Sequence, residues 1–254
     1  MKIAFLASQT EKAEKALKQL VDIYGQCSPS DADYLVTLGG DGHLLEVMHH
    51  YDQDILTKPI YGMNLGSMGF LLNRFIPIDL VARIENAQKV WLKPLLMRAC
   101  DAKGLCKEAL AINEVSLLRQ TRQAAHLQIA VDGVVRMKQL VCDGLILATP
   151  AGSTAYNLSA NGPILPLRSQ LLAMTPLSPF RPRRWPGALL PEDAQVEITI
   201  LGADKRPVHA VADSFEVRNV TQLFIRSHPE KRYQLLFDPD QHLEERIFQE
   251  QFAH

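Results

Sequence analysis

A glycine-rich turn around one carboxylate is the clearest sign of chemistry in the chain. Residues 39–42 read Gly-Gly-Asp-Gly and join the apolar run 34–38, a predicted buried strand, to a helical pattern that begins at Leu44. Glycines let a backbone bring its N–H groups close to a ligand, and a helix N-terminus favours anions such as phosphate. Asp41 is then an anion where anions bind, which indicates work on a hydroxyl group or a magnesium ion. The alternative is that Asp41 only caps the helix.

A second glycine-rich turn, residues 62–70, follows the next predicted strand. It is not the dinucleotide motif G-x-G-x-x-G, and the chain also lacks the phosphate-loop motif G-x-x-x-x-G-K-[ST]. Alone, this turn slightly favours a packing role. Taken with the first turn, it predicts two strand ends that converge on one ligand, as in open α/β sheets. The residues expected to form this phosphate turn are Gly39, Gly40, Asn64 and Gly66.

Asn113 and Glu114 interrupt the apolar strand predicted over 109–118. An amide beside a carboxylate suits the hydroxyls of a sugar, with Asn donating and Glu accepting hydrogen bonds. Adjacent strand residues point to opposite faces, so both can face a ligand only if a bulge re-aims one of them. A bulge or an edge position with no ligand is the alternative.

The most informative segment is 143–163. Asp143 begins an apolar strand, which opens after residue 148 into a loop dense in hydroxyl groups and small residues. A purely structural loop rarely needs so many of these in succession, so the segment predicts a ligand-binding loop. Its candidate hydrogen-bond donors are Ser153, Thr154, Tyr156 and Ser159, of which Tyr156 also offers a stacking face.

The pattern of elements predicts an α/β N-terminal domain with a parallel sheet, followed by a β-rich C-terminal domain. Residues 1–92 alternate strands with helices, the last helix running from Asp79 to about Trp91. Residues 93–238 are rich in strands, with a tight hairpin at Asp132-Gly133. Residues 239–254 are predicted to form a helical tail, which gives three expected segments: 1–92, 93–238 and 239–254.

Composition narrows the class of protein. The chain has 254 residues, of which 47% are hydrophobic and 22% charged, with a formal net charge of -1. This balance argues against electrostatic binding to nucleic acid or membrane, and no apolar run reaches the length of a membrane span. The N-terminus is expected to be a strand and not a signal peptide. The four cysteines show no metal-binding spacing and are expected to be reduced thiols in a cytoplasmic protein.

Together and in this order, segments 39–42, 64–70, 113–114 and 143–163 resemble those of NAD kinases of the short bacterial type. The resemblance covers nearly the whole chain and is most specific in 149–159. It implies a phosphofructokinase-like α/β domain, a β-rich domain, and transfer of the γ-phosphoryl group of ATP to the 2′-hydroxyl of the adenosine ribose of NAD. It also implies a homodimer or homotetramer with active sites shared between subunits.

The resemblance also implies roles for individual residues. Asp41 matches the catalytic acid-base residue, and Asp143 matches a carboxylate that reaches the substrate across a subunit contact. Magnesium or another divalent cation would accompany ATP, held mainly by its phosphates, with no protein ligand assigned. The expected NAD-binding residues are Asp41, Gly42, Phe70, Asn113, Glu114, Asp143, Thr154, Ala155, Tyr156, Asn157, Leu158, Ser159, Ser178 and Asp213.

Three positions depart from the family pattern, namely Val141, Asn161 and Phe215, and they bear on phosphate binding and product preference. Two other functions stay open on the sequence. A lipid or sugar kinase of the same superfamily shares Gly-Gly-Asp-Gly, although the 149–159 loop favours a dinucleotide. A non-catalytic NAD or NADP sensor would bind the dinucleotide without forming product, and the intact Asp41 argues against it.

Overall fold

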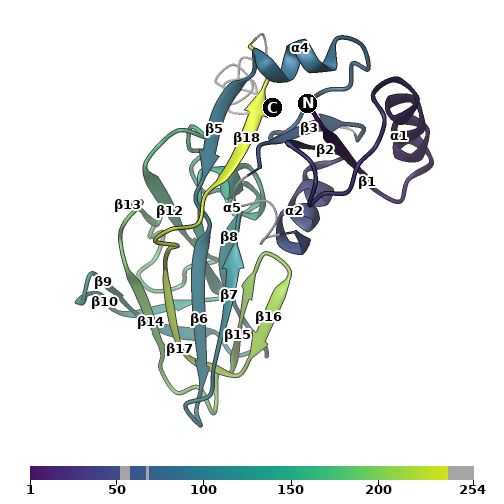
Figure 1. Ribbon diagram of the computed structural model, residues 1–254. Coiled ribbons are helices and arrows are strands. Elements are labelled where there is room, and N and C mark those ends of the chain that lie inside the picture. The colour runs from purple at the N-terminus through teal and green to yellow at the C-terminus, as the bar shows by residue number, and fades with distance from the viewer. Residues whose placement is uncertain (52–57, 67–68, 240–254) are drawn as a thin grey trace. The chain divides into compact units, whose positions relative to one another are not determined.

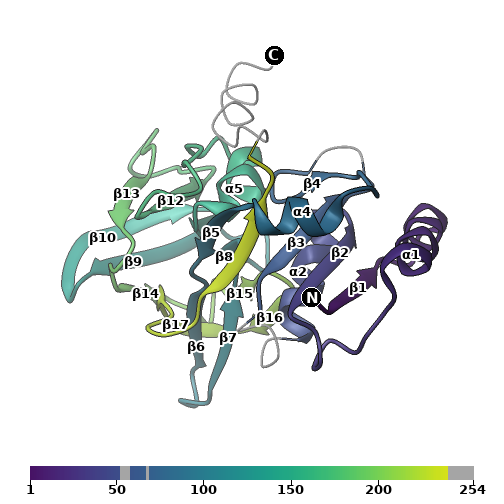
Figure 2. The ribbon, with the colours of Figure 1, turned by 45° about the horizontal axis from the view of Figure 1, so that its top comes forward.

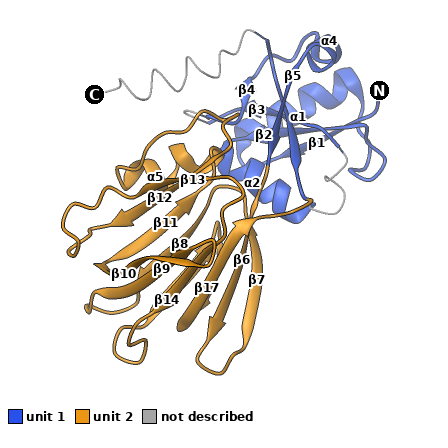
Figure 3. Ribbon diagram, turned by 90° about the vertical axis from the view of Figure 1, so that its left-hand side faces the viewer, with its two compact units in different colours: residues 1–92, 231–254 blue, residues 93–230 orange. Residues whose placement is uncertain are grey.

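The computed structural model describes residues 1–51, 58–66 and 69–239, shown in Figure 1. The chain divides into two compact units, coloured separately in Figure 3. Unit 1 combines Met1–Leu92 with the C-terminal part of the chain from Lys231, and unit 2 comprises Lys93–Glu230. Within the described ranges, no helix is long and apolar enough to cross a membrane.

Unit 1 is built on one sheet with the strand order β1-β2-β3-β18-β5, and β4 also pairs with β3. The pairs β1–β2, β2–β3, β3–β4 and β3–β18 are parallel, which confirms the predicted α/β class. The elements of unit 1 are β1 (Ile3–Ala7), α1 (Glu11–Tyr24), β2 (Tyr34–Gly39), α2 (Asp41–His50), β3 (Ile60–Asn64), β4 (Asn73–Arg74), α4 (Leu80–Glu85), β5 (Gln88–Leu92) and β18 (Tyr233–Phe237).

Helix α1 shows how the sequence sets these elements. The Thr10 side chain accepts a hydrogen bond from the N–H of Ala13 and so caps the helix. Ala13, Ala16 and Leu20 recur at spacings of three and four residues, and all three are buried. The spacing therefore gives the helix one apolar face, which joins the core cluster of unit 1.

Strand β18 corrects the expected domain boundary at the C-terminal end. The sequence placed residues 231–238 in the β-rich domain, but β18 pairs with β3 and with β5 of unit 1, as can be followed in Figure 2. Tyr233, Leu235 and Phe237 are all buried. A strand with paired neighbours on both sides suits such an apolar run. The predicted tail helix lies outside the described residues from 240 onward.

The helix expected from Asp79 to Trp91 is also wrong in part. Helix α4 ends at Glu85, and β5 follows and pairs antiparallel with β18. In β5 the buried Val90 and Leu92 alternate with exposed residues, which is the period of a strand. Because this alternation is short and directly follows a helix, the sequence pattern predicts one continuous helix. Asp79 occupies the N-cap position, but its side chain makes no capping hydrogen bond.

Unit 2 consists of two six-stranded antiparallel sheets, which confirms the β-rich prediction. The first has the order β10-β9-β14-β17-β6-β7 and the second β13-β12-β11-β8-β15-β16. The elements are β6 (Leu95–Asp101), β7 (Cys106–Ala111), β8 (Glu114–Arg119), β9 (Ala125–Val131), β10 (Val134–Cys142), β11 (Gly144–Ala148), η1 (Ala151–Thr154), α5 (Tyr156–Ser159), β12 (Leu171–Leu177), β13 (Ala188–Pro191), β14 (Val196–Ile200), β15 (Val208–Ala212), β16 (Phe215–Arg218) and β17 (Val220–Ser227).

One hydrophobic core joins the two sheets of unit 2. It contains Met97 and Leu127 from the first sheet and Leu117 and Leu147 from the second. The tight hairpin at Asp132-Gly133 is confirmed, because it connects β9 and β10. Both turn residues have positive φ, 53° and 75°, as a type I′ turn requires.

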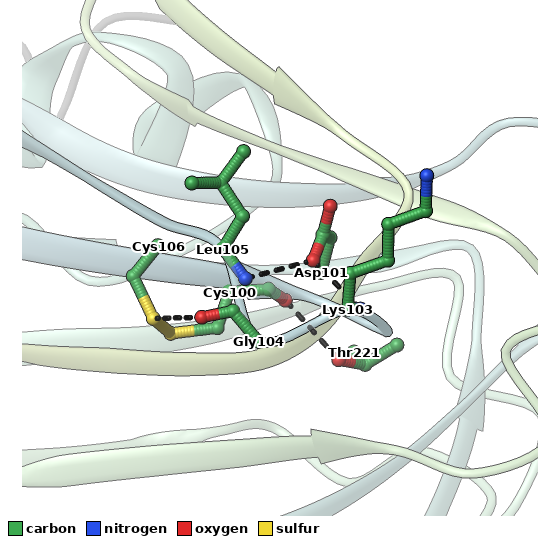
Figure 4. Close-up of a disulfide and its surroundings, with 7 residues drawn as sticks. All are labelled: Cys100, Asp101, Lys103, Gly104, Leu105, Cys106 and Thr221. Atoms are coloured by element: carbon green, nitrogen blue, oxygen red, sulfur yellow. Dashed lines mark hydrogen bonds between the residues drawn. A yellow bond between two sulfur atoms is a disulfide. The ribbon is translucent and has the colours of Figure 1, made fainter.

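The prediction that all four cysteines are reduced is wrong for two of them. Cys100 and Cys106 face each other in the register of β6 and β7 and form a disulfide, shown in Figure 4. The Asp101 side chain accepts hydrogen bonds from the N–H groups of Lys103 and Leu105 and orders the turn between the cysteines. Cys142 is a buried thiol, and burial raises its pKa to about 12, which makes it unreactive.

We expect two cysteines of the denatured protein to react with an alkylating agent without reductant, and four after reduction. Because the bridged residues are only 6 apart in sequence, the loop-entropy model limits the stabilisation to about 2 kcal/mol. Reductant should therefore lower the urea midpoint of the wild type and of the control Cys27→Ser, but not of Cys106→Ser. Four reactive thiols without reductant would contradict the bridge.

Candidate functional site

The two glycine-rich turns meet in unit 1, as the sequence predicts. Strands β2 and β3 are parallel neighbours, and Gly39 is the register partner of Asn64. The N–H of Leu65 donates to the carbonyl of Gly39 at 2.9 Å, and the N–H of Gly66 donates to Asn64 Oδ1 at 2.9 Å. Both turns therefore lie at the carboxyl ends of parallel strands, where open α/β sheets bind ligands.

Asp41 ties these turns together. It is the first residue of α2, and its carboxylate accepts hydrogen bonds from the N–H of Phe70 at 2.7 Å and of Leu71 at 3.2 Å. A Cβ atom at Gly69 would lie 3.2 Å from Asp41 Oδ1, so the second turn approaches the carboxylate closely. The alternative that Asp41 only caps its own helix is not what the structure shows, because the N-cap residue is Gly40 and no side chain caps α2.

In unit 2 the predicted strand over 109–118 is two strands. Strand β7 ends at Ala111 and belongs to the first sheet, while β8 begins at Glu114 and belongs to the second. Asn113 therefore lies in the crossing between sheets, and the alternation rule does not apply across the break.

The loop after β11 is fastened to the same crossing. The Thr149 hydroxyl donates to the carbonyl of Ile112 at 2.7 Å, and the Thr149 N–H donates to the carbonyl of Asn113 at 2.9 Å. A Cβ atom at Gly152 would lie 2.1 Å from the Asn113 carbonyl oxygen, so only glycine fits there. The loop and the Asn113-Glu114 pair are consequently brought together.

Two polar side chains of this loop make hydrogen bonds within the protein. Asn157 is fully buried; its amide donates to the carbonyls of Ser153 and Pro163, and its Oδ1 accepts from the Thr175 hydroxyl. The Ser153 hydroxyl donates to the Pro150 carbonyl and accepts from the N–H of Leu165. Both side chains therefore hold the loop in shape. The loop residues that remain at least partly accessible are Thr154, Ala155, Tyr156, Leu158 and Ser159.

The oxygens of Asn113 and Glu114 are the unusual feature of this end of unit 2. Among the residues that the structure describes, Asn113 Oδ1 and Glu114 Oε2 are buried without a hydrogen-bond partner. Burial, and then the negative charge of Asp213, raise the pKa of Glu114 to about 7. Buried polar atoms are nearly always hydrogen-bonded, so such a pair indicates a place for a ligand.

Asp143 and Ser178 do not belong to this cluster. Asp143 precedes β11, whose register partners place Ala148 beside Glu114 but Gly144 beside Leu118. Asp143 and the Thr149 loop therefore lie at opposite ends of the strand, roughly 20 Å apart at 3.4 Å per residue. The Asp143 carboxylate pairs with Arg119 Nε at 2.6 Å, and its N–H donates to the carbonyl of Leu177, the residue before Ser178.

The structure adds residues that the sequence reasoning missed. The sequence pattern gives Thr149 no role beyond its place in the 149–159 loop, and it does not link Arg119 to Asp143. The signal for Thr149 was its place directly after a buried strand; nothing local indicated Arg119, because only strand pairing brings it to Asp143. In the described part of the chain, no three His, Cys, Asp or Glu side chains gather to hold a metal ion.

The fold defines a class of two-unit proteins, with glycine-rich turns on a parallel sheet in one unit and two antiparallel sheets in the other. Two family models agree, the ATP-NAD kinase N-terminal domain over residues 2–92 and the ATP-NAD kinase C-terminal domain over residues 112–223. The chain belongs to the NAD kinase family, and its function is ATP-dependent phosphorylation of NAD to NADP.

Curated relatives agree over the full length. The chain is 53% identical to an NAD kinase of Hyphomonas neptunium over 253 residues, which is 100% of this chain and 98% of the relative. It is 52% identical to an NAD kinase of Xylella fastidiosa over 252 residues, 99% and 96% of the two chains.

Solved structures share the fold. A yeast NADH kinase complexed with NADH has a TM-score of 0.81 at 19% identity, covering 98% of this chain and 86% of that one. An Archaeoglobus fulgidus NAD kinase in complex with ATP has a TM-score of 0.74 at 22% identity, covering 98% and 97%. Both likenesses support the architecture described above.

Glu114 should make stability depend on pH. Its pKa is higher in the folded protein than in the unfolded chain, so its stabilising contribution is complete below about pH 4.5 and is lost as the pH rises through about 7. Glu114→Gln removes this titration. When the pH rises from 5 to 8, the free energy of unfolding of the wild type should therefore fall by up to about 3 kcal/mol more than that of the variant.

Urea unfolding at the two pH values measures this difference. The matched control is Glu108→Gln, at an exposed position of the same unit. Equal pH dependence of Glu114→Gln and the wild type would show that Glu114 is already ionised at neutral pH.

Proposed function

We propose that the enzyme transfers the γ-phosphoryl group of ATP to the 2′-hydroxyl of the adenosine ribose of NAD. The observation that carries this assignment is the pair of buried acceptors Asn113 Oδ1 and Glu114 Oε2. Ribose hydroxyls and the adenine amino group of a dinucleotide supply the donors that these oxygens lack. The exposed Tyr156 and Ser159 add a stacking face and a hydroxyl from the adjoining loop.

Asp41 is proposed as the group that orients the acceptor hydroxyl and takes its proton late in the reaction. Phosphoryl transfer has a loose transition state, so the protein contributes mainly positioning and charge stabilisation. The hydrogen bonds that the Asp41 carboxylate accepts from the N–H groups of Phe70 and Leu71 fix its orientation. The amide-rich turns at Gly39, Gly40, Gly42 and Gly66 suit phosphate oxygens.

The donor substrate is proposed to be ATP with a divalent cation such as Mg²⁺ bound to its phosphates. Mg²⁺ is usually bound through one or two carboxylates together with substrate phosphates, so the ion is proposed to be held mainly by the phosphates of the nucleotide. Phe70, half-buried in the second turn, is proposed to border the pocket for the adenine of NAD. The reaction is proposed to take place in the cytoplasm, where both substrates are available.

Asp143 and Ser178 are proposed to complete the site of a partner subunit in a homodimer or homotetramer. Their distance along the sheet from the Asn113-Glu114 pair of the same chain supports this arrangement. A symmetric dimer places the same patch of both chains in contact, so each chain would lend its Asp143 to the other.

Asp41→Asn should leave the affinity for NAD nearly unchanged and reduce NADP formation by about 10²-fold or more, the size typical of acid-base residues. The assay offers ATP and Mg²⁺ with NAD, NADH, diacylglycerol or fructose 6-phosphate to the wild type and the variant. NAD should be phosphorylated by the wild type at the 2′ position. Near-normal turnover by Asp41→Asn would refute the proposed role.

Mixing two inactive variants tests the shared site. Asp41→Asn and Asp143→Asn subunits, co-expressed with separate tags, should recover about a quarter of wild-type activity if they assort at random into dimers, because half of the dimers are mixed and each has one intact site. The variants expressed separately provide the baseline. Activity of the mixture no greater than that baseline, or full activity of Asp143→Asn alone, would contradict a shared site.

A further inference from the structure

The crossing from β7 to β8 leaves backbone groups outside both sheets. Ile112 and Asn113 lie between the strands, and neither has a register partner in a ladder. Buried N–H and C=O groups need hydrogen-bond partners, so something other than a strand must supply them here. How these groups are satisfied determines how Asn113 and Glu114 are presented.

Asp213 supplies the acceptors for all three N–H groups of this segment. Its carboxylate accepts from the N–H of Ile112 at 2.7 Å, of Asn113 at 3.0 Å and of Glu114 at 3.3 Å. Its own N–H donates to the Glu114 carbonyl at 3.2 Å. Thr149 donates hydrogen bonds to the carbonyls of Ile112 and Asn113. Asp213 and Thr149 together therefore satisfy every backbone group of 112–114.

The turn after β15 positions Asp213 to accept these hydrogen bonds. It follows β15, which pairs with β8 so that Ala212 lies opposite Val115. Its φ of 49° is in the left-handed region, which aspartate tolerates better than most residues. Carboxylate-to-amide hydrogen bonds are charge-assisted and stronger than neutral ones. The turn therefore presents a strong acceptor at the end of β8.

We propose that Asp213 is a positioning residue and not a substrate contact: it fastens the backbone of 112–114 where the chain crosses from one sheet to the other, so that Asn113 and Glu114 both serve the ligand. This differs from the role that the family resemblance implies, in which Asp213 itself binds NAD. The ligand in question is the dinucleotide of the proposed function, and the inference rests on that function for its consequence, although not for the hydrogen bonds.

The position of Asp213 also places a negative charge next to Glu114. Of the strands that pair with β8, β11 places Ala148 opposite Glu114, whereas β15 ends at Ala212, directly before Asp213. Asp213 is the charged group whose repulsion adds to burial in raising the pKa of Glu114. Removing this charge should therefore shift the pH at which the affinity for NAD changes, which a purely structural role would not do.

The test compares Asp213→Ala and Asp213→Asn with the wild type and with Asp204→Asn, a control at an exposed position of the same unit. Asp213→Asn keeps one acceptor oxygen and the shape of the side chain, so it remains informative if Asp213→Ala folds poorly. Hydrogen–deuterium exchange of the amides of 112–114 is measured first, because it does not depend on any enzymatic activity. Steady-state kinetics with NAD and ATP are then measured from pH 5.5 to 8.5.

The expected results are faster exchange at 112–114 in both Asp213 variants and a KM for NAD raised about tenfold or more, with the KM for ATP within about twofold of the wild type. In Asp213→Asn the midpoint of the pH dependence of KM for NAD should move to lower pH. The control Asp204→Asn should match the wild type throughout.

Unchanged exchange at 112–114 would overturn the proposal, whatever the kinetics. Faster exchange with an unchanged KM for NAD, or with equal changes in both KM values, would also overturn it, since the hydrogen bonds would then matter only for stability. A wild-type protein that makes no NADP refutes the proposed function instead, and the exchange experiment still decides whether Asp213 holds the segment.

Discussion

The passage of the chain from one sheet of unit 2 to the other is the constraint on which the candidate site depends. A strand that leaves a sheet gives up its ladder, and the freed backbone groups must be satisfied locally. In this protein two residues from distant parts of the sequence, Asp213 and Thr149, satisfy all of them with their side chains and their own backbone N–H groups. With the backbone hydrogen-bonded in this way, Asn113 Oδ1 and Glu114 Oε2 are buried without a hydrogen-bond partner, and we propose that they bind the ligand.

In unit 1 a carboxylate likewise accepts hydrogen bonds from the backbone N–H groups of a turn. The Asp41 carboxylate accepts hydrogen bonds from two amides of a neighbouring turn, as Asp213 does from three. In both units an acidic side chain fixes a loop that no strand orders. The consequences differ, because Asp41 lies at a helix N-terminus among glycine-rich turns, whereas Asp213 lies beside Glu114, whose pKa is raised by burial and then by the charge of Asp213.

Local patterns in the sequence predicted much of this. The Gly-Gly-Asp-Gly turn, the Asp132-Gly133 hairpin and the alternation of strand and helix are short-range signals, and each corresponds to the observed backbone. Asn113-Glu114 was correctly seen as an interruption, but not as a crossing between sheets. The hydrogen bonds of Asp213 to residues a hundred positions away leave no local pattern, so sequence reasoning could place it near the site only through the family resemblance.

The errors have the same origin. Strand β18 and the Cys100–Cys106 bridge are set by pairing partners, and neither partner can be read from the strand itself. Strand pairing likewise separates Asp143 from the Thr149 loop, although the two are only six residues apart in the chain. The sequence could therefore name candidate residues, whereas strand register decides which of them serve one site.

The most direct test of the account is a crystal structure of the protein with NAD bound. We expect Asn113 Oδ1 and Glu114 Oε2 each to lie about 3 Å from a donor atom of the adenosine part of NAD, with the Asp213 carboxylate still on the backbone of 112–114. A structure in which NAD binds elsewhere and leaves both oxygens without a ligand donor would contradict it.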